Sequence, residues 1–236
     1  STMAVTHTLG AQRAYSITLP MTDTNGAAVS ISLNYLLYLP DDYGQEPQRR
    51  WPLILFLHGA GQRGDNIDQV ALLGLPNLVN TRLKLPALVI SPQLPSGAYW
   101  NDYVGALEAL LDQIAVKYAI NPKQVYVTGF SMGGYGTWAL GLNAPDRFAA
   151  LVPVAGGWDA SAANICTLKS VPIWVLHGAN DEMVVPAASD EMVKALRACG
   201  GNVRYTLLPR TTHAASATVA YLQPELFEWL LAQHLP

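Results

Sequence analysis

The chain has 236 residues, of which 50 % are hydrophobic and 13 % charged, and its net charge at pH 7 is −3. This composition excludes a disordered chain, and the length fits one large α/β domain, so we expect a single domain over residues 1–236. There is no long basic run and no apolar stretch near the roughly 20 residues of a transmembrane helix. We therefore expect no nucleic-acid and no membrane partner.

The N-terminal part of the chain predicts two paired strands. Thr8–Thr18 and Ile31–Leu39 are strand-like, and the second run alternates before it becomes continuously apolar. The Asn25-Gly26 pair between them is a good signal for a hairpin. We expect these two strands to form an antiparallel edge of a larger sheet.

From Leu53 onward, predicted strands alternate with predicted helices. The longest helix is expected to run from a cap at Asn101 or Asp102 to about Tyr118, because its apolar residues recur at helical spacing. The alternation predicts a mostly parallel sheet with helices on both faces. The predicted strands are Leu53–Leu57, Ala87–Ser91, Gln124–Thr128, Phe148–Val154, Ile173–Leu176 and Val203–Leu208, and the other predicted helices are Ile67–Leu73, Met132–Leu142, Pro186–Cys199 and Pro224–His234.

Residues 129–133, Gly-Phe-Ser-Met-Gly, lie between a strand-like run and a helix-like run. In this context the pattern G-x-S-x-G predicts a sharp strand-to-helix turn that presents the Ser131 hydroxyl at the top of a sheet. The two glycines are expected where side chains would collide with the neighbouring strand and helix. The alternative is an ordinary loop serine between a buried strand and a packed helix.

A serine nucleophile needs a base, and the base needs an orienting acceptor. In a parallel sheet these groups follow the carboxyl ends of strands. His213 follows the last strand and is the candidate base, with a surface loop histidine as the alternative; His177 also ends a strand but precedes a better acid candidate. That acid is Asp181, and Asp159 is its rival. The order Ser131, Asp181, His213 is the one expected for this architecture.

The oxygen of a tetrahedral intermediate needs two N–H donors. The candidates are the amide of Met132, directly after the nucleophile, and the amide of Ala60 in the loop after Leu53–Leu57, which could instead be only a tight turn. Residues 59–64 also fit the dinucleotide pattern G-x-G-x-x-G, but Val79–Leu85 lacks the acidic residue that such a site needs. We expect no cofactor and no metal.

With these residues in hand, the chain resembles the α/β-hydrolase superfamily. It is most similar to the small, lidless carboxylesterases of the phospholipase/carboxylesterase and dienelactone-hydrolase neighbourhood, which includes members called predicted peptidases. The resemblance implies acyl transfer from an ester to water by Ser131, Asp181 and His213, with the amides of Ala60 and Met132 holding the oxyanion. The matching segments, between about residues 35 and 231, are YLLYLPDDY, PLILFLHGAGQRGD, SPQLP…YW, VYVTGFSMGGYGTW, VPIWVLHGANDEMVV and PELFEWLL.

One segment departs from the family pattern. Relatives often carry an acid and a tryptophan shortly after the catalytic histidine, whereas residues 214–216 are Ala-Ala-Ser here. The triad assignment is unaffected, but any substrate contact that this loop makes in relatives is not expected in this chain.

The spacing between the strands that end near Val154 and begin near Ile173 leaves little room for an inserted helical cap. We therefore expect no cap domain and an open cleft for small-molecule or polymer-attached esters. Trp100, Trp158 and Met183 lie in loops at the catalytic end and are candidate substrate-binding residues, with ordinary packing as the alternative. Aromatic walls would suit aryl or cinnamoyl acyl groups as well as short aliphatic ones.

Other functions remain open at this point. The same triad cleaves amides, so a serine peptidase or an aryl-acylamidase is the second hypothesis, and an inactive hydrolase fold that serves as a binding module is the third. The start Ser1-Thr2-Met3 fits a tag remnant or a trimmed leader, so a cytoplasmic and a secreted location are both open. Oligomeric state is not predicted. Cys166 and Cys199 can form a disulfide if the fold brings their Cα atoms within about 7 Å, and are otherwise two small buried hydrophobes.

Overall fold

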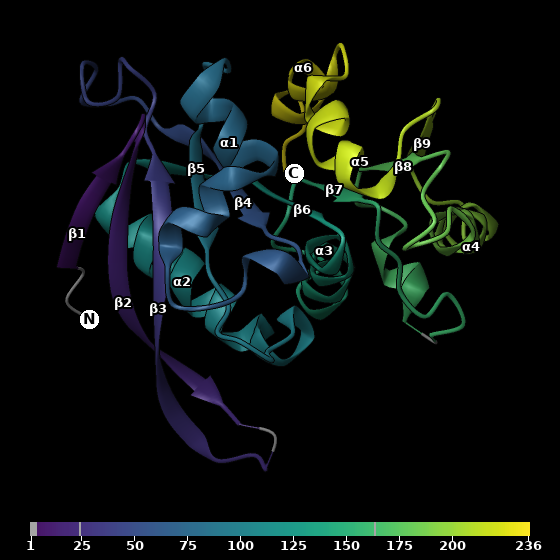
Figure 1. Cartoon of the computed structure of the whole chain (residues 1–236), viewed down its shortest axis with the longest axis horizontal. Coiled ribbons are helices and arrows are strands. Elements are labelled where there is room, and N and C mark those ends of the chain that lie inside the picture. The colour runs from purple at the N-terminus through teal and green to yellow at the C-terminus, as the bar shows by residue number, and fades with distance from the viewer. Residues whose placement is uncertain (1–3, 24, 163) are drawn as a thin grey trace.

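The computed structural model describes residues 4–23, 25–162 and 164–236. Ser1–Met3, on which the choice between tag and leader rests, lie outside these residues. One nine-stranded sheet with the order β1-β2-β3-β5-β4-β6-β7-β8-β9 organises the chain, and helices cover both of its faces (Figure 1). The strands are β1 (Ala4–Leu9), β2 (Gln12–Thr22), β3 (Ala28–Tyr38), β4 (Trp51–Leu57), β5 (Leu88–Pro92), β6 (Ile120–Phe130), β7 (Ala150–Val154), β8 (Ile173–Gly178) and β9 (Val203–Leu208). The α-helices are α1 (Gly74–Thr81), α2 (Val104–Lys117), α3 (Met132–Asn143), α4 (Ala187–Ala198), α5 (His213–Val219) and α6 (Leu226–Leu231), and the 3₁₀ helices are η1 (Ala60–Gln62), η2 (Ile67–Leu72), η3 (Trp100–Tyr103), η4 (Ile165–Leu168) and η5 (Ala220–Leu222).

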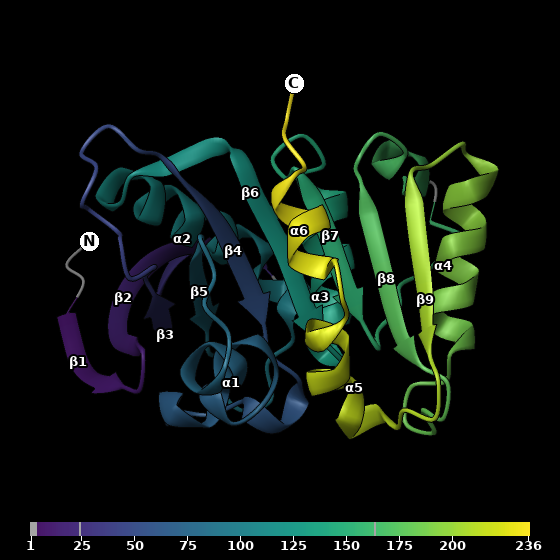
Figure 2. The ribbon, with the colours of Figure 1, turned by 90° about the horizontal axis from the view of Figure 1, so that it is seen from above.

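Strands β4 to β9 run parallel to one another, as the alternation of strands and helices predicts. In the register of β4 and β6, Leu57 lies opposite Gly129, so the two strands end level with each other. Figure 2 shows the arrowheads of β4, β6, β7, β8 and β9 pointing to the same lower edge. Residues that follow these strands therefore gather along one edge of the sheet, far from each other in sequence but close in space.

The sheet separates the two large hydrophobic cores of the described residues. Successive residues of a strand point to opposite faces, so in β4 Leu53, Leu55 and Leu57 belong to one core and Ile54 and Phe56 to the other. Residues of α2, α3 and α4 complete the first core, and residues of α1, α5 and α6 complete the second. Because both faces are covered, the strands are apolar in continuous runs, and each buried large aliphatic side chain contributes about 1.5–3 kcal/mol to folding.

The antiparallel N-terminal edge has three strands where the sequence predicts two. The predicted strand Thr8–Thr18 is divided between β1 and β2, which pair antiparallel and reverse direction at Gly10. Gly10 has a φ of +60°, a conformation that glycine adopts without a steric cost. The sequence contains no second turn residue beside it, so the reversal could not be predicted. The predicted hairpin at Asn25-Gly26 does connect β2 to β3, although Thr24, within this turn, lies outside the described residues.

Several helix boundaries also differ from the prediction. Neither Asn101 nor Asp102 caps the long helix. Both residues belong to the 3₁₀ helix η3, which precedes α2, and the N-cap of α2 is Tyr103. The segment that forms α1 was not predicted to be helical, since Gly74 and Pro76 obscure its pattern. The last helix, α6, is shorter than the predicted Pro224–His234. None of the described helices is long and apolar enough to cross a membrane.

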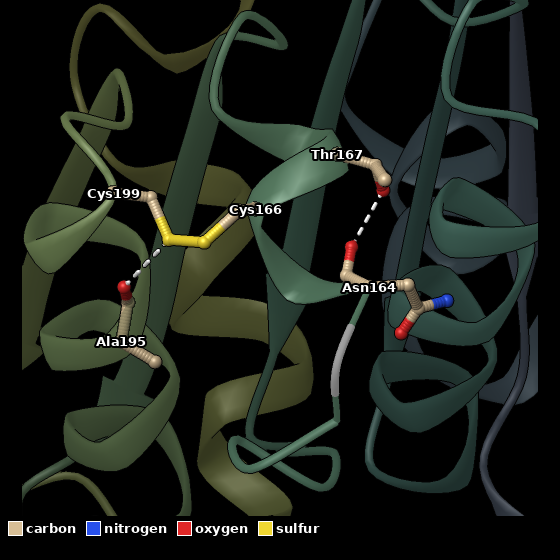
Figure 3. The surroundings of a disulfide bond; sticks show 5 residues. All are labelled: Asn164, Cys166, Thr167, Ala195 and Cys199. Atoms are coloured by element: carbon tan, nitrogen blue, oxygen red, sulfur yellow. Dashed lines mark hydrogen bonds between the residues drawn. A yellow bond between two sulfur atoms is a disulfide. The ribbon is translucent and has the colours of Figure 1, made fainter.

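The connection between β7 and β8 contains, in its described part, only the short helix η4. Cys166 in η4 forms a disulfide with Cys199 at the C-terminal end of α4, with a Cα–Cα distance of 5.6 Å. Figure 3 shows the bond joining the two elements. The disulfide thus ties this connection, which also carries Trp158, to a helix of the main body.

Removing this disulfide should lower the thermal stability of the protein. The two cysteines are 33 residues apart, and closing a loop of this length stabilises the folded state by about 3–4 kcal/mol in the chain-entropy model. The double variant Cys166→Ser/Cys199→Ser should therefore melt roughly 5–15 °C below the wild type in calorimetry. Reductant should lower the melting temperature of the wild type and leave that of the variant unchanged. Two free thiols in unfolded, unreduced protein would contradict the bond.

Candidate active site

Ser131 lies on a sharp turn between β6 and α3. Its φ is 57° and its ψ is −118°, a region that non-glycine residues rarely occupy and that costs about 1–3 kcal/mol. The backbone amide of Ser131 donates to the carbonyl of Val154 at 2.9 Å, and its carbonyl accepts from the amide of Gly134 at 2.8 Å. These bonds hold the strained turn at the carboxyl edge of the sheet.

Two glycines allow α3 to pack this closely against the strands. A Cβ atom at Gly129 would overlap the carbonyl of Gly133, and a Cβ atom at Gly133 would overlap the carbonyl of Leu57 in β4. Any side chain at either position would push α3 away from the sheet and move Ser131 with it. The strand–turn–helix geometry that the five-residue pattern predicts is therefore present.

His213 joins Ser131 to Asp181. Its Nε2 atom lies 2.8 Å from Ser131 Oγ, and its Nδ1 atom lies 2.6 Å from Asp181 Oδ2. Because a carboxylate can only accept, Nδ1 carries the proton and Nε2 is free to accept from the serine hydroxyl. The imidazole packs against the ring of Phe130, with 4.9 Å between ring centroids. His213 is the first residue of α5, a helix that the sequence did not predict.

The side chain of Asp181 is fully buried and is held by its own loop. Its Oδ1 atom accepts from the amides of Met183 at 3.0 Å and Val184 at 2.9 Å. His177 lies behind the carboxylate: its Nε2 is 2.7 Å from the carbonyl of Val184, and its Nδ1 is 2.6 Å from Ser189 Oγ. His177 therefore supports the acid loop and does not contact Ser131.

Backbone bonds connect the loop that carries the acid to the loop that carries the base. The amide of Ala179 donates to Leu208 at 2.9 Å, and that of Asn180 donates to Thr211 at 3.0 Å. A Cβ atom at Gly178 would overlap the carbonyl of Thr211. The separation of Asp181 and His213 is thus set by the main chain.

His58 holds the loop that follows β4. Its Nδ1 lies 2.6 Å from the carbonyl of Gly59, and its Nε2 accepts from the amide of Leu94 at 3.0 Å. The peptide group is planar and trans, so fixing the Gly59 carbonyl also fixes the direction of the Ala60 N–H. Within the described part of the chain, the amides of Ala60 and Met132 donate to no protein acceptor. Both are available to a ligand.

A cavity of about 380 Å³ opens beside Ser131. Four of its ten lining residues are aromatic, and Ala60 and Met132 line it together with Ser131. Trp100 is fixed there by the bond from its Nε1 to the carbonyl of His58 at 2.9 Å. The lining residues are Ala60, Arg63, Tyr99, Trp100, Asn101, Ser131, Met132, Tyr135, Gly136 and Trp158.

The structure brings together seven of the eight candidate site residues. Ser131, His213 and Asp181 form one hydrogen-bonded chain, and Ala60, Met132, Trp100 and Trp158 line the cavity next to it. Met183 is not among the cavity residues, and 79 % of its surface is exposed. It was expected there because it lies in a loop at the catalytic end, but its side chain is exposed to solvent while its amide donates to Asp181.

Asp159, the rival acid, is not the partner of His213, which pairs with Asp181. Its Oδ1 atom accepts from the amide and the hydroxyl of Ser161, and these bonds lower the pKa of its carboxyl group. In the part of the chain that the structure describes, no group of three His, Cys, Asp or Glu side chains is arranged to hold a metal ion.

Sequence reasoning missed five of the residues that line the cavity. These are Arg63, Tyr99, Asn101, Tyr135 and Gly136. Tyr135 lies one turn after Ser131 in α3, so the helical pattern could have placed it at the cavity. Tyr99 and Arg63 lie in loops whose course is decided only by the fold.

Comparisons with known proteins identify the family of this chain. Residues 27–202 match the model of the Esterase family, described as "Putative esterase". The chain belongs to this family. Among curated relatives, it is 34 % identical over 143 residues to a poly(3-hydroxybutyrate) depolymerase of Ralstonia pickettii and 26 % identical over 166 residues to feruloyl esterase C of Emericella nidulans. The matches cover 53 % and 68 % of this chain but only 29 % and 59 % of those proteins.

Solved structures confirm the fold of this esterase-family chain. A thermostable esterase, 27 % identical, superimposes with a TM-score of 0.73 over 94 % of this chain and 72 % of its own. A feruloyl esterase module of Clostridium thermocellum, solved with sinapinate, gives 0.67 over 92 % and 87 % at 18 % identity. The chain thus has the α/β-hydrolase fold that the sequence motifs predicted, with its mostly parallel sheet.

His58 should make the stability of this fold depend on pH. Burial, aided by the positive charge of Arg63 and opposed by the hydrogen bond to the Gly59 carbonyl, lowers the pKa of His58 to about 4. In the unfolded chain a histidine titrates near 6.5. Neutral His58 therefore makes its full contribution to the free energy of unfolding above about pH 6.5. This contribution is lost as the pH falls to about 4, a difference of about 3 kcal/mol.

Denaturant unfolding at pH 7, 5.5 and 4 measures this loss. In His58→Asn, whose amide can still donate near the Nδ1 position, the decrease in unfolding free energy over that interval should be smaller by that amount. An identical decrease in wild type and variant would show that His58 is not the group responsible.

Proposed function

We propose that the chain is a serine carboxylesterase that hydrolyses short-chain or aryl and cinnamoyl esters through an acyl-enzyme. The observation that carries this proposal is the hydrogen-bonded chain from Ser131 through His213 to Asp181, beside a cavity with two free amides. The esterase family and the names of its relatives support the same chemistry.

In the first half of the reaction, Ser131 Oγ attacks the ester carbonyl. Its proton passes to Nε2 of His213, and Asp181 stabilises the imidazolium through Nδ1. The negative charge that develops on the carbonyl oxygen is held by the amides of Ala60 and Met132, which line the cavity and have no acceptor in the described part of the chain. The proton on His213 then goes to the leaving alcohol, and the acyl group remains on Ser131.

In the second half, water replaces the alcohol. His213 takes a proton from the water as it attacks the acyl carbonyl, and the same two amides hold the second oxyanion. The proton returns to Ser131 as the acid leaves. Every group that these steps require belongs to this chain, so the proposed reaction uses no cofactor and no metal.

The aromatic cavity supports the proposed substrate range. Tyr99, Trp100, Tyr135 and Trp158 offer flat apolar surfaces next to the nucleophile, which suit an aryl or cinnamoyl group as well as a short alkyl chain. Feruloyl esterase and poly(3-hydroxybutyrate) depolymerase are among the names of the relatives. We propose small-molecule or polymer-attached esters as substrates.

We also infer an oxidising compartment for this reaction. Disulfides such as Cys166–Cys199 persist in secreted and extracellular proteins and are rare where glutathione keeps thiols reduced. Of the two locations that the sequence left open, the disulfide favours the secreted one.

Replacing Ser131 by Ala should abolish ester hydrolysis. The test is a p-nitrophenyl ester series from acetate to palmitate, with methyl ferulate and p-nitroacetanilide, measured with wild type and Ser131→Ala in parallel. We expect wild-type turnover of short or cinnamoyl esters and a loss of at least about 10³-fold in the variant, since the residual rate comes from the cavity alone.

The other results would separate the alternatives. Hydrolysis of the anilide in preference to the esters would favour an amidase, and an inactive wild type that binds ligand would favour a binding module. Equal activity in wild type and variant would place the chemistry elsewhere. The variant should keep the melting temperature of the wild type within a few degrees, which shows that the loss is chemical.

Ala60→Pro tests the oxyanion site through the backbone. Proline has no N–H, and it is tolerated at the first residue of a helix after an extended residue. Ala60 begins η1, and Gly59 before it is extended, with φ −79° and ψ 174°. The variant should fold with near-normal stability and lose about 10²–10³-fold in kcat/KM. A folded Ala60→Pro enzyme with wild-type kcat/KM would exclude this amide from the oxyanion site.

A further inference from the structure

Arg63 is the one charged residue among those that line the cavity beside Ser131. The cavity residues include no aspartate and no glutamate, and the other walls are aromatic, small or uncharged. Placing a cation on an otherwise apolar wall costs solvation free energy. That cost is recovered only if the cation binds a partner. The sequence analysis did not assign Arg63 any function, and the proposed ester hydrolysis does not use it.

The partners of Arg63 within the protein are neutral. Its Nε donates to the carbonyl of Ala60 at 3.1 Å and its Nη1 to the carbonyl of Ala98 at 3.0 Å. The guanidinium lies 5.2 Å from the centre of the Tyr99 ring. In the described residues Nη2 has no acceptor, so its two N–H groups are available to a ligand.

No acid of the described chain neutralises this charge. None of the ion pairs formed by the described residues includes Arg63. Of the three acids nearest to the cavity residues in sequence, Asp65 is exposed, Asp102 accepts from Asn101 and lines a neighbouring cavity, and Asp159 accepts from the amide and hydroxyl of Ser161. The field of Arg63 also reaches the loop after β4, where it contributes to the low pKa of His58.

The guanidinium is positioned before any ligand arrives. The two carbonyl bonds and the ring of Tyr99 restrict a side chain that would otherwise lose about 2 kcal/mol of rotamer entropy on binding. A fixed, half-buried guanidinium with free N–H groups matches a carboxylate, which it can bind with charge-assisted hydrogen bonds. The aromatic walls would meanwhile hold the apolar part of the same molecule.

We propose that Arg63 selects esters that carry a carboxylate on the acyl or the alcohol part, such as half-esters of dicarboxylic acids or oligomers of hydroxy acids with a free acid end. This inference rests on the proposed esterase function and names the substrate class of the same cavity. Arg63 would act as a specificity residue: it would lower KM for the anionic ester and leave the triad chemistry unchanged.

Two matched pairs of esters test the proposal. On the acyl side, p-nitrophenyl hemiadipate is compared with p-nitrophenyl heptanoate, and on the alcohol side 4-butyryloxybenzoate is compared with phenyl butyrate. For each pair the measured quantity is the ratio of kcat/KM for the anionic ester to kcat/KM for the neutral one. Using a ratio removes any effect of Arg63 on the shape of the loop, because such an effect acts on both esters.

In at least one pair, Arg63→Gln should lower this ratio about tenfold, mainly through KM, as expected for one charge-assisted hydrogen bond. Arg63→Lys keeps the charge and should retain part of the preference. Arg49→Gln is the matched control: Arg49 pairs with Asp42 before β4, outside the cavity, so the variant removes one positive charge and should leave the ratio unchanged. Added salt should reduce the wild-type ratio towards that of Arg63→Gln.

The possible failures are distinguishable. If the wild type hydrolyses neutral esters but neither ratio depends on Arg63 or on salt, this inference is wrong and the esterase proposal stands, with Arg63 acting only as a clamp on the loop. If the wild type hydrolyses no ester of either pair, the proposed function itself fails. Should Arg63→Gln not fold, the wild-type salt dependence and Arg63→Lys decide the question.

Discussion

The close approach of α3 to the parallel sheet is the constraint on which the rest of the site depends. Gly129 and Gly133 have no side chains, so the first turn of α3 rests directly on the Leu57 carbonyl of β4. This contact holds Ser131 in its strained conformation and places Met132, the next residue, at the cavity. The strain is local, whereas the packing that maintains it extends through both cores, so the serine is placed by the whole sheet.

Asp181 and His213 are held in place by different contacts. Asp181 is fixed by its own loop, by the amides of Met183 and Val184 and by the buried His177 behind it. His213 is fixed because its loop is bonded to the loop of the acid. Their relative position is therefore set by main-chain hydrogen bonds, which are less sensitive to nearby side-chain changes than side-chain contacts would be.

The loop after β4 contributes to the cavity in three ways. His58 fixes the peptide that presents the Ala60 amide and accepts a bond from Leu94, while its carbonyl holds Trp100 in the cavity wall. Arg63 holds the next carbonyl and adds a positive charge. This loop therefore carries the amide that we propose as an oxyanion donor, the carbonyl that holds Trp100 and the positive charge of the cavity.

Much of this organisation was determined by the sequence alone. Hydrophobic runs and their spacing predicted the parallel sheet, and the glycine pattern around Ser131 predicted the turn, because both follow from local rules of side-chain direction and steric overlap. The assignment of Asp181 over Asp159 and of His213 over His177 came from strand order, which places residues at an edge of the sheet. Only the tertiary structure decided which residues line the cavity. Trp100 and Trp158 line it as predicted, and Met183 does not. Arg63 and Tyr99 line it although no sequence pattern indicated this. The reversal at Gly10, the helix that begins at His213 and the pairing of Cys166 with Cys199 were likewise set by contacts between segments distant in sequence, which no local pattern encodes.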